Sequence, residues 1–424
     1  MLTLGAATPA LAQRADGPYS GLFGGQPDEN RYQGLDLRAS LFGAWDQNIF
    51  PASDASAQTD TRLRESGASG GASGTLLYDR RGDRAVFLLN GTANAREYAS
   101  DPTLVTAYEG GTQLTAKLTD RVIFNAGGAA SYSPFFQFAP FLDQGAGATT
   151  VTPVTGNFGY AALAERNLGL NGTLGFTDNL TRRTSLYITG NGSNYQLLDD
   201  PANNMRSIGG RAGITHQLTR ALGVHAAYGR DQFTYAGSSP YINETIDVGV
   251  DYGDTLSFAR RTALTFSTST SAIRYLGDTH YRLNGTARLT RGFSRSWSTF
   301  VGYDRATEFR IGFRAPLLTD SASAGLSGQL ATRVQWSGGG GYTRGNIGFD
   351  SSHFSSYSAS SRLDFALTRA LALYGQYAYY HYEVPPGSSV LDFVPRFSRQ
   401  VATVGLSVWV PLVNDVRPPK EPRP

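Results

Sequence analysis

Charged side chains recur at every second position in several long segments, with apolar residues between them. If these segments are extended, alternate side chains share one face, so the charges gather on one surface. There, planar guanidinium groups can hold carboxylate or phosphate groups through paired hydrogen bonds. The basic candidates are Arg38, Arg96, Lys117, Arg121, Arg211, Arg282, Arg288, Arg333, Arg362 and Arg399. The acidic candidates are Asp36, Asp46, Glu109, Asp231, Asp247, Asp251 and Asp364.

Two interpretations of this charged surface stay open. The charges could pair across neighbouring strands and fill an interior, because an unpaired buried charge is costly. Alternatively, they line a wet pore whose arginines attract anions, including anionic polysaccharide. Because the candidates comprise ten cations and seven acids, we predict that such a pore prefers anions.

The histidines do not form a catalytic arrangement. A hydrolase of the serine type would need a serine, a histidine and an acid or amide on facing strands. Only His225 falls on the charged face, whereas His216 falls on the opposite face, and His280, His353 and His381 lie near expected loops. No histidine pair has the HExxH spacing of a zinc site, and cysteine is absent. We therefore expect no enzymatic activity, no cofactor and no metal site.

Composition favours one large all-β unit. The 424 residues include 50 glycines, 23 tyrosines and 23 phenylalanines, and no Pro- or Ser-rich linker divides them. The net charge of +3 gives no basis for nucleic-acid binding. The start, "MLTLGAATPALAQ", is typical of the end of a secretory signal cleaved before Gln13, so residues 1–12 are interpreted as a signal-peptide remnant.

The elements that must carry the charged face are long alternating strands. In the segment Arg84–Tyr98, Phe87 and Leu89 fall on one face, while Asn90 and Arg96 fall on the other. Such segments run roughly 10 to 13 residues, the length of a tilted membrane strand, whereas strands of soluble sandwiches usually have about 5 to 6. No run of 18 apolar residues predicts a membrane-spanning helix.

Short polar breaks separate these strands, and several contain the phrase "LTR" or "LTD". They lie near Arg81-Gly82, Thr119-Asp120, Thr177-Asp178, Thr219-Arg220, Gly253-Asp254, Arg291-Gly292, Ala331-Thr332 and Thr368-Arg369. Longer polar stretches such as "ASDPTLVT", "LDDPANNM", "AGSSPY" and "VPPGSSVLDFVPRF" lie between them. Only two long strands fit each period of about 40 residues, which argues against a propeller blade. Eight short turns with both chain ends on their side predict a closed antiparallel transmembrane barrel of about 18 strands.

Aromatic residues are expected to form a girdle at each end of the barrel's apolar band. The girdle near the turns would contain Trp297, Trp336, Phe365 and Trp409. The girdle near the long loops would contain Trp45, Tyr132, Tyr303, Tyr342 and Tyr357. Both belts support a membrane-spanning barrel.

The longest inter-strand segment, Ser133–Tyr160, is the third loop on the extracellular side. It carries the constriction-loop candidates Phe135, Phe136, Phe138 and Phe141. These rings could fold inside against Tyr187, Phe300 or Tyr374 and offer flat faces to sugar rings. They could also dip into the outer leaflet or pack on one another as an extracellular lid.

Together with this pattern, the phrases "SGTLLYDRRGDRAVF" and "NAGGAASYSPF" make the chain resemble the outer-membrane β-barrel porin family of Gram-negative bacteria, which includes barrels associated with exopolysaccharide operons. The resemblance covers roughly residues 32–412, the predicted barrel, and implies short periplasmic turns and long extracellular loops. Residues 13–31 would form a periplasmic N-terminal segment. Residues 413–424 would form a Pro-rich periplasmic tail, which departs from the terminal aromatic residue common in such barrels.

Two functions of different classes follow from these observations. The first is an outer-membrane channel for hydrophilic solutes, with secretion of an anionic exopolysaccharide as the more specific form. The alternative is a non-conducting structural or adhesion barrel plugged by its own loops. Expected partners are outer-membrane lipid and lipopolysaccharide, a solute or polysaccharide in the lumen, and a periplasmic partner for the C-terminal tail.

Overall fold

The computed structural model describes residues 31–49, 66–137, 161–163, 165–235, 240–256, 259–275, 278–294, 296–309, 313, 315–349, 352–386 and 395–416. The strands of the barrel are β1 (Arg31–Ile49), β2 (Gly67–Arg81), β3 (Ala85–Tyr98), β4 (Asp101–Lys117), β5 (Val122–Ser133), β8 (Asn167–Asp178), β9 (Thr184–Leu197), β10 (Met205–Gln217), β11 (Leu222–Tyr235), β12 (Tyr241–Leu256), β13 (Ala259–Tyr275), β14 (Asp278–Gly292), β15 (Ser298–Glu308), β16 (Leu317–Ala331), β17 (Val334–Ile347), β18 (His353–Ala366), β19 (Leu371–Glu383) and β20 (Arg396–Val416).

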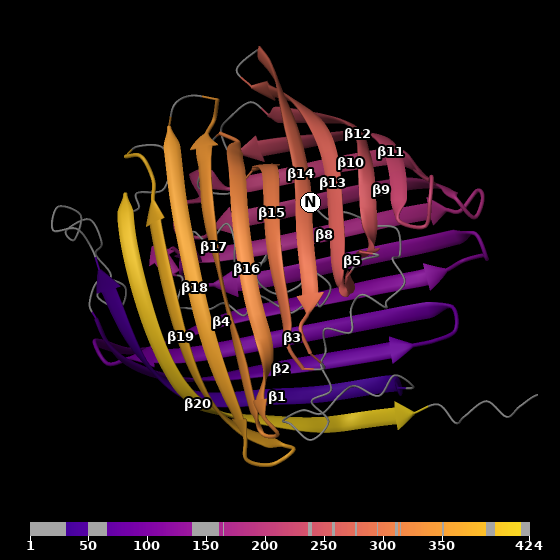
Figure 1. Cartoon of the computed structure of the whole chain (residues 1–424). Helices are drawn as coiled ribbons and strands as arrows, with labels where there is room; N and C mark the ends of the chain where they lie inside the picture. Colours follow the sequence, from indigo (N-terminus) through magenta and orange to yellow (C-terminus); the bar gives the residue numbers. More distant parts are fainter. Residues whose placement is uncertain are drawn as a thin grey trace, which may run out of the picture.

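These strands form one closed antiparallel barrel of 18 strands, which confirms the predicted fold (Figure 1). Each strand pairs with its neighbour in the chain, and β1 closes the barrel by pairing with both β2 and β20. Two short strands, β6 (Phe136–Gln137) and β7 (Ala161–Leu163), pair with each other apart from the barrel. Among the described residues, no helix has the length and apolar character needed to cross a membrane.

The connections divide the barrel into two ends. The turn end carries the eight short turns and the barrel termini Arg31 and Val416; the loop end is opposite. Segment 134–166 is the third connection at the loop end, as predicted. One predicted long loop is wrong: "ASDPTLVT" is mostly strand, because β4 already begins at Asp101 and its residues continue the alternation. The break near Gly253-Asp254 also falls later, since β12 continues to Leu256.

The recurring "LT" phrase builds one kind of turn. The Oγ1 atom of Thr219 accepts hydrogen bonds from the backbone N–H groups of Ala221 and Leu222, at 3.2 and 3.0 Å. Leu218 donates its N–H to the carbonyl of Leu222 at 2.9 Å. The turns that begin at Leu118 and Leu367 repeat these three bonds. A threonine that satisfies two turn amides explains why the sequence returns to this phrase.

The two faces of the wall separate by alternation. On β1, Leu37, Leu41 and Trp45 are exposed, whereas Asp46 on the other face is buried. Ladder partners keep their faces around the barrel, so the polar face is continuous and turns inward, while the apolar face turns outward. Many strands are longer than the predicted 10 to 13 residues, and β20 reaches 21.

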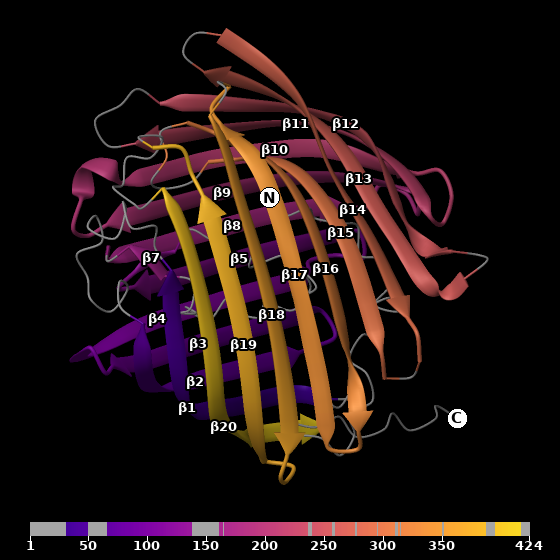
Figure 2. The same cartoon turned by 60° about the vertical axis from the view of Figure 1, so that its left-hand side comes forward.

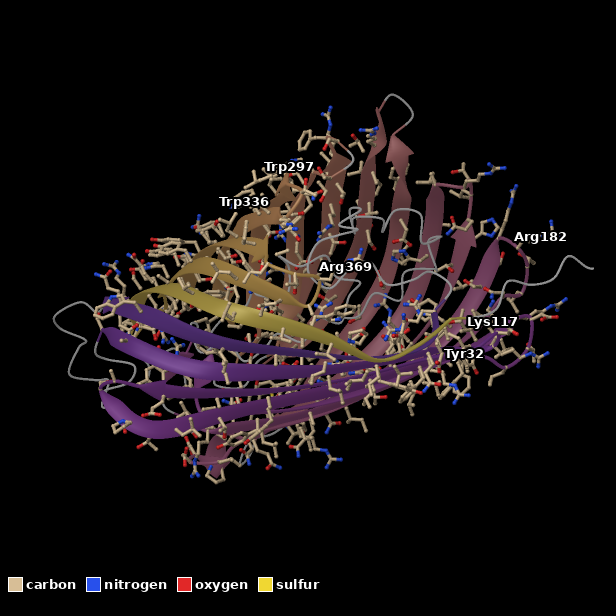
Figure 3. The ribbon with its side chains drawn as sticks, turned by 90° about the horizontal axis from the view of Figure 1, so that it is seen from below. Tyr32, Lys117, Arg182, Trp297, Trp336 and Arg369 are labelled. Atoms are coloured by element: carbon tan, nitrogen blue, oxygen red, sulfur yellow. The ribbon has the colours of Figure 1, made fainter. Side chains whose placement is uncertain are left out.

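The aromatic girdles are present with one exception. Trp297 and Trp336 lie together on the outer face near the turn end, with ring centroids 6.2 Å apart (Figure 3). Trp45, Tyr303, Tyr342 and Tyr357 are exposed on the outer face near the loop end. Trp409 does not belong to the girdle: it pairs with Arg38 across β1 and β20, and therefore faces inward. Alternate residues of a strand face opposite sides, so an error of one residue in the expected strand position places Trp409 on the wrong face.

The barrel bounds differ slightly from the predicted domain bounds. The strands extend from Arg31 to Val416, so β20 continues four residues into the segment interpreted as the tail. The predicted signal-peptide remnant, most of the N-terminal segment and residues 417–424 lie outside the described residues.

Candidate functional site

The inner face of the barrel carries most of the predicted pore-lining residues. Strand alternation places these side chains there: Arg38, Arg96, Lys117, Arg211, Arg282, Arg288, Arg362, Arg399, Asp36, Asp46, Glu109, Asp231, Asp247, Asp251 and Asp364. Arg121 and Arg333 instead lie in turns between strands. Tyr187, Phe300 and Tyr374 also lie on the inner face.

Several inner-face charges were missed, most of them near strand ends whose limits the sequence places poorly. The additional acids are Asp79, Asp278, Asp304 and Glu308, and the additional cations are Arg81 and Arg261. Arg31 also reaches this face, since its guanidinium contacts Asp36 at 2.9 Å and Asp79 at 3.6 Å. The predicted excess of cations over acids is therefore not found among the strand residues.

The charges are instead sorted onto two walls. The wall made by β18–β20 and β1–β3, which we call the basic wall, carries Arg31, Arg38, Arg81, Arg96, Arg362 and Arg399 with Asp36, Asp46, Asp79 and Asp364. The wall made by β10–β15, which we call the acidic wall, carries Asp231, Asp247, Asp251, Asp278, Asp304 and Glu308 with Arg211, Arg261, Arg282 and Arg288. In the strand order of the ring these walls lie on roughly opposite sides.

The inner face between these walls is mostly uncharged and polar, with Glu109 and Lys117 of β4 as charged residues there. On β16 and β17 the inner positions include Thr319, Ser321 and Thr343, and on β5 and β8 they include Asn125 and Asn171. Because the two walls carry net charges of opposite sign, we expect an electric field across the barrel, with mostly neutral polar surface on either side.

A buried triad anchors the basic wall near the loop end. One oxygen of Asp46 accepts hydrogen bonds from the guanidinium groups of Arg96 and Arg399, at 3.0 and 2.9 Å. All three side chains are at most 3% exposed. Arg96 also donates to Ser69 and lies 5.0 Å from the ring centroid of Tyr98. The triad carries one net positive charge and joins β3, β1 and β20.

Nearer the turn end, the basic wall is more open. Arg38 is exposed even though it faces inward. Arg362 donates to Asp364 at 3.0 Å, and its guanidinium lies 4.2 Å from the ring centroid of Tyr374. That ring lies against Gly405, where a Cβ would come within 2.8 Å of it. The inner surface is therefore accessible at this level, and its cations are only partly neutralised.

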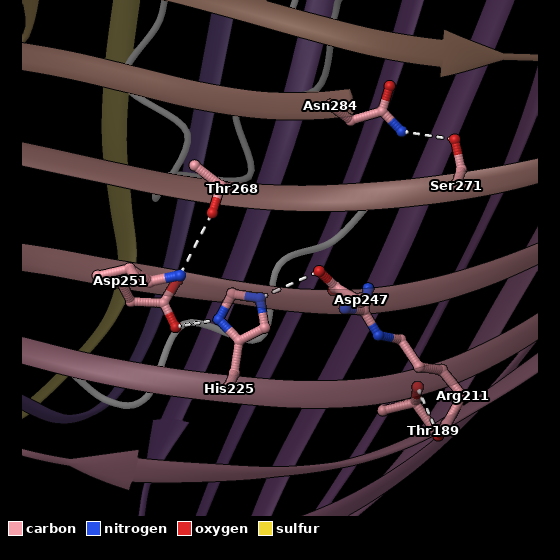
Figure 4. Close-up of polar contacts among 9 residues, drawn as sticks. Thr189, Arg211, His225, Asp247, Asp251, Thr268, Ser271 and Asn284 are labelled. Atoms are coloured by element: carbon pink, nitrogen blue, oxygen red, sulfur yellow. Dashed lines mark hydrogen bonds and ion pairs between the residues drawn. The ribbon is translucent and has the colours of Figure 1, made fainter. Parts of the chain in front are cut away.

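The centre of the acidic wall is a histidine held between two aspartates (Figure 4). His225 Nδ1 lies 2.6 Å from Asp251, and Nε2 lies 3.0 Å from Asp247. Each ring nitrogen therefore faces a carboxylate oxygen. Arg211 forms an ion pair with the same Asp247. These two contacts fix the imidazole of His225 against the acidic wall.

The local sequence explains this geometry. In "DVGVD", the two aspartates stand two residues to either side of Gly249, which is the cross-strand partner of His225. A Cβ at Gly249 would lie 2.7 Å from the imidazole and 2.1 Å from the carbonyl oxygen of Thr268. The glycine therefore leaves room for the ring to lie over β12 and reach both carboxylates. The spacing Asp-x-Gly-x-Asp opposite a histidine is the signal that could have identified this cluster.

Two arginines of the acidic wall find other partners. Arg282 donates to the carbonyl oxygen of Thr319 on β16, at 2.9 Å. The guanidinium of Arg288 lies 4.2 Å from the ring centroid of Phe300. His280, which we had placed near a loop, also faces inward on β14 and stacks on Phe349 at 3.7 Å.

Phe135, the first constriction-loop candidate, packs inside the barrel. Its side chain is fully buried and meets the ring of Tyr98 edge-on, with centroids 6.4 Å apart. Val105 and Ala107 complete this apolar cluster on the inner face. The partner is therefore Tyr98, rather than the three aromatic residues that we expected. The side chain of Phe136, and the whole of Phe138 and Phe141, lie outside the described residues.

A second aromatic contact also narrows the loop end. Phe233 on the inner face of β11 stacks on Phe309, which follows β15, with centroids 3.9 Å apart. Buried inner-face side chains such as Tyr98, Leu197 and Ile273 lie toward this end, whereas Arg38 is open nearer the turns. The inner surface is thus packed near the loops and accessible below them.

At the loop rim, outside the strands, Arg166 and Asp199 form an exposed pair. Hydrogen bonds from the Arg166 side chain and backbone lower the pKa of Asp199. Because its folded-state pKa is lowered, Asp199 stabilises the folded rim at pH values above its unfolded-state pKa. This stabilisation is lost as pH falls through the folded-state pKa.

We expect Asp199→Asn to lower the local stability of this loop at pH 7 by less than about 1 kcal/mol, and therefore to increase its proteolysis slightly. The variant and the parent should converge as pH falls through the folded-state pKa of Asp199. Limited proteolysis at pH 7 and at acidic pH measures this. A difference in cleavage rate between variant and parent that is the same at both pH values would contradict the prediction.

No protein-family profile and no curated protein matches the sequence. Solved structures with a similar chain path include OpdQ of Pseudomonas aeruginosa, at 11% identity and a TM-score of 0.43, covering 90% of this chain and 98% of that one. P. aeruginosa OccK2, solved in complex with glucuronate, has 10% identity and a TM-score of 0.45 over 90% and 98%. The siderophore receptor PirA of P. aeruginosa has 10% identity and a TM-score of 0.41 over 91% and 81%.

Proposed function

We propose that this protein is an outer-membrane channel that passes hydrophilic solutes through the barrel lumen. The outward apolar face and the aromatic belts at its two ends suit a barrel that crosses a bilayer. Barrels of 16 to 18 strands are wide enough to leave an aqueous channel. The exposed, inward-facing Arg38 supports a wet interior.

The observation that carries this proposal is the division of the inner charges into a basic and an acidic wall. Many of these charges pair within their own wall, as Arg362 does with Asp364 and Arg211 with Asp247, but the basic wall keeps more cations than acids and the acidic wall keeps more acids than cations. Separated walls leave a transverse field that acts on a solute passing between them. A solute with both positive and negative groups can align with this field, whereas a simple anion gains from one wall only.

The two walls predict weak ion selectivity, whereas the charge count along the sequence predicted a preference for anions. With the strand charges balanced, we expect a reversal potential near zero under a salt gradient in planar bilayers. Arg38→Gln on the basic wall should shift the channel toward cations. Asp251→Asn, whose side chain is 41% exposed, should shift it toward anions.

Opposite shifts from these two variants would support the two-walled channel. Equal shifts in one direction would contradict the separation of charge. Absence of conductance in a correctly inserted parent protein would favour the alternative, a structural or adhesion barrel plugged by its own loops.

Secretion of an anionic exopolysaccharide is the second candidate function. It is favoured by the accessible part of the basic wall near the turn end, where Arg38 stands across from Trp409 and Arg362 lies over Tyr374. Guanidinium groups beside aromatic faces suit acidic sugars. A long anionic oligosaccharide added on the turn side should then block ion current, and Arg38→Gln should weaken that block.

A further inference from the structure

The wall of the barrel has a seam between β14 and β15. Their ladder begins at Gly285 and Arg305 and continues only toward the turns. Loopward of this point, Tyr281–Asn284 of β14 pair with β13, but no described residue on the β15 side pairs with them. Figures 1 and 2 show β14 diverging from β15 toward the loop end. The ladder to β14 ends at Arg305, although β15 continues to Glu308 and stays paired there with β16.

The seam exposes apolar side chains on the outer face. Tyr281 is 75% exposed and Leu283 is 61% exposed, and Tyr281 exceeds every other large apolar side chain of the described part of the chain. The seam is bridged by side chains: Arg282 donates to the carbonyl oxygen of Thr319, and Thr307 contacts Asn284 at 3.4 Å. The backbone N–H and C=O groups of an unpaired strand edge are unfavourable in hydrocarbon unless a polar group satisfies them, whereas the exposed apolar side chains suit acyl chains.

Arginines flank this apolar surface on the same outer face. Arg274 is 59% exposed and shares Glu244 with Arg230. On the other side of the seam, Arg305 is 45% exposed and lies 3.6 Å from Asp320. The three guanidinium groups are about half exposed, although Glu244 is only 20% exposed, so each keeps N–H groups open to an added anion.

The arginines belong to an arc that covers only part of the circumference. Within the last residues of each strand at the loop end, the outer face of β10–β17 carries Arg206, Arg230, Arg274, Arg305 and Arg344, with Glu244 and Asp320 as its acids. The corresponding outer positions of β1–β5 carry no arginine, and their charged residue is Glu97. The arc is thus a basic surface directly above the outward apolar face.

We propose that the seam between β14 and β15 binds the phosphorylated glycolipid of the outer leaflet. Its acyl chains cover Tyr281 and Leu283, and its phosphate groups bind Arg274 and Arg305. Several phosphates on one lipid match arginines on separate strands, and paired N–H donors suit phosphate oxygens. This inference rests on the outer-membrane location in the proposed function, but not on conduction.

The first test measures lipid A retained by the purified full-length protein, using native mass spectrometry and titration with lipid A micelles. Arg274→Gln with Arg305→Gln should weaken lipid A binding about tenfold. The matched control is Arg182→Gln with Arg220→Gln, two exposed arginines of the turn end, which should bind lipid A as the parent does. Both double variants should keep the parent's conductance. A loss of lipid A binding can therefore be distinguished from a loss of channel function.

A second test uses the absence of cysteine from the chain. Extending the ladder register places Leu283 opposite Thr307 across the seam. Oxidative cross-linking of cysteines at these two positions should be several-fold slower with lipid A bound than in detergent alone, because lipid seated in the seam keeps the two strands apart. The control pair, Leu289→Cys with Val301→Cys, lies within the ladder and should cross-link equally in both conditions.

Equal binding of lipid A to the Arg274/Arg305 double variant and to the Arg182/Arg220 control would overturn the proposal. Equal binding of phosphatidylglycerol and lipid A would overturn the glycolipid assignment, and equal binding of dephosphorylated lipid A would overturn the role of phosphate. Cross-linking at the seam that lipid A leaves unchanged would show that the lipid does not seat there.

Discussion

Replacing Asp46 with alanine is expected to destabilise the folded barrel by about 3–5 kcal/mol, because two buried guanidinium groups lose their shared carboxylate. Arg96 and Arg399 are both nearly inaccessible to solvent, so water cannot take the place of Asp46. Urea titration of the refolded protein, followed by heat-dependent mobility on gels, measures the loss. Trp45, next in the chain, offers a local fluorescence probe.

Two further variants make this result specific. Asp364→Ala removes a carboxylate from a half-exposed pair with Arg362, and we expect it to cost less than about 1 kcal/mol. Replacing all three triad residues with apolar ones of similar volume should recover most of the stability, since no buried charge then remains. Equal losses for Asp46→Ala and Asp364→Ala would show that burial of the triad does not govern its contribution.

Deleting residues Phe135–Thr155 should raise single-channel conductance several-fold while the barrel stays folded. Phe135 is the fully buried start of this segment and is fixed inside against Tyr98, whereas the barrel's ladder bonds lie in the strands. The smaller change Phe135→Ala should act in the same direction, because it removes an apolar contact worth about 3–5 kcal/mol in a packed core.

Planar-bilayer recordings on heat-stable, correctly inserted protein decide this prediction. Leu104→Ala, which shortens an exposed outer-face side chain of β4, serves as the control and should leave conductance unchanged. If the deletion variant conducts like the parent, segment 135–155 does not narrow the pore. Any selectivity would then come from the two charged walls alone.

The sequence by itself determined the barrel. Strict alternation over long strands assigns each side chain to a face, as for Leu37 and Asp36, and this local property survives folding. The repeated threonine turns fix where strands end, because the bonds of Thr219 involve neighbouring residues only. Strand number, closure, and the inward placement of the predicted strand arginines all follow from local patterns.

Tertiary structure alone decided how the inner charges are distributed. Which strands lie opposite each other, and which side chains meet across three strands as Arg96, Asp46 and Arg399 do, depends on register and closure. Counting charges along the sequence therefore predicted an excess of cations where the barrel has two opposed walls. The burial of Phe135 against Tyr98 and the end of the ladder between β14 and β15 likewise depend on contacts between segments that are distant in the sequence, which no local pattern encodes.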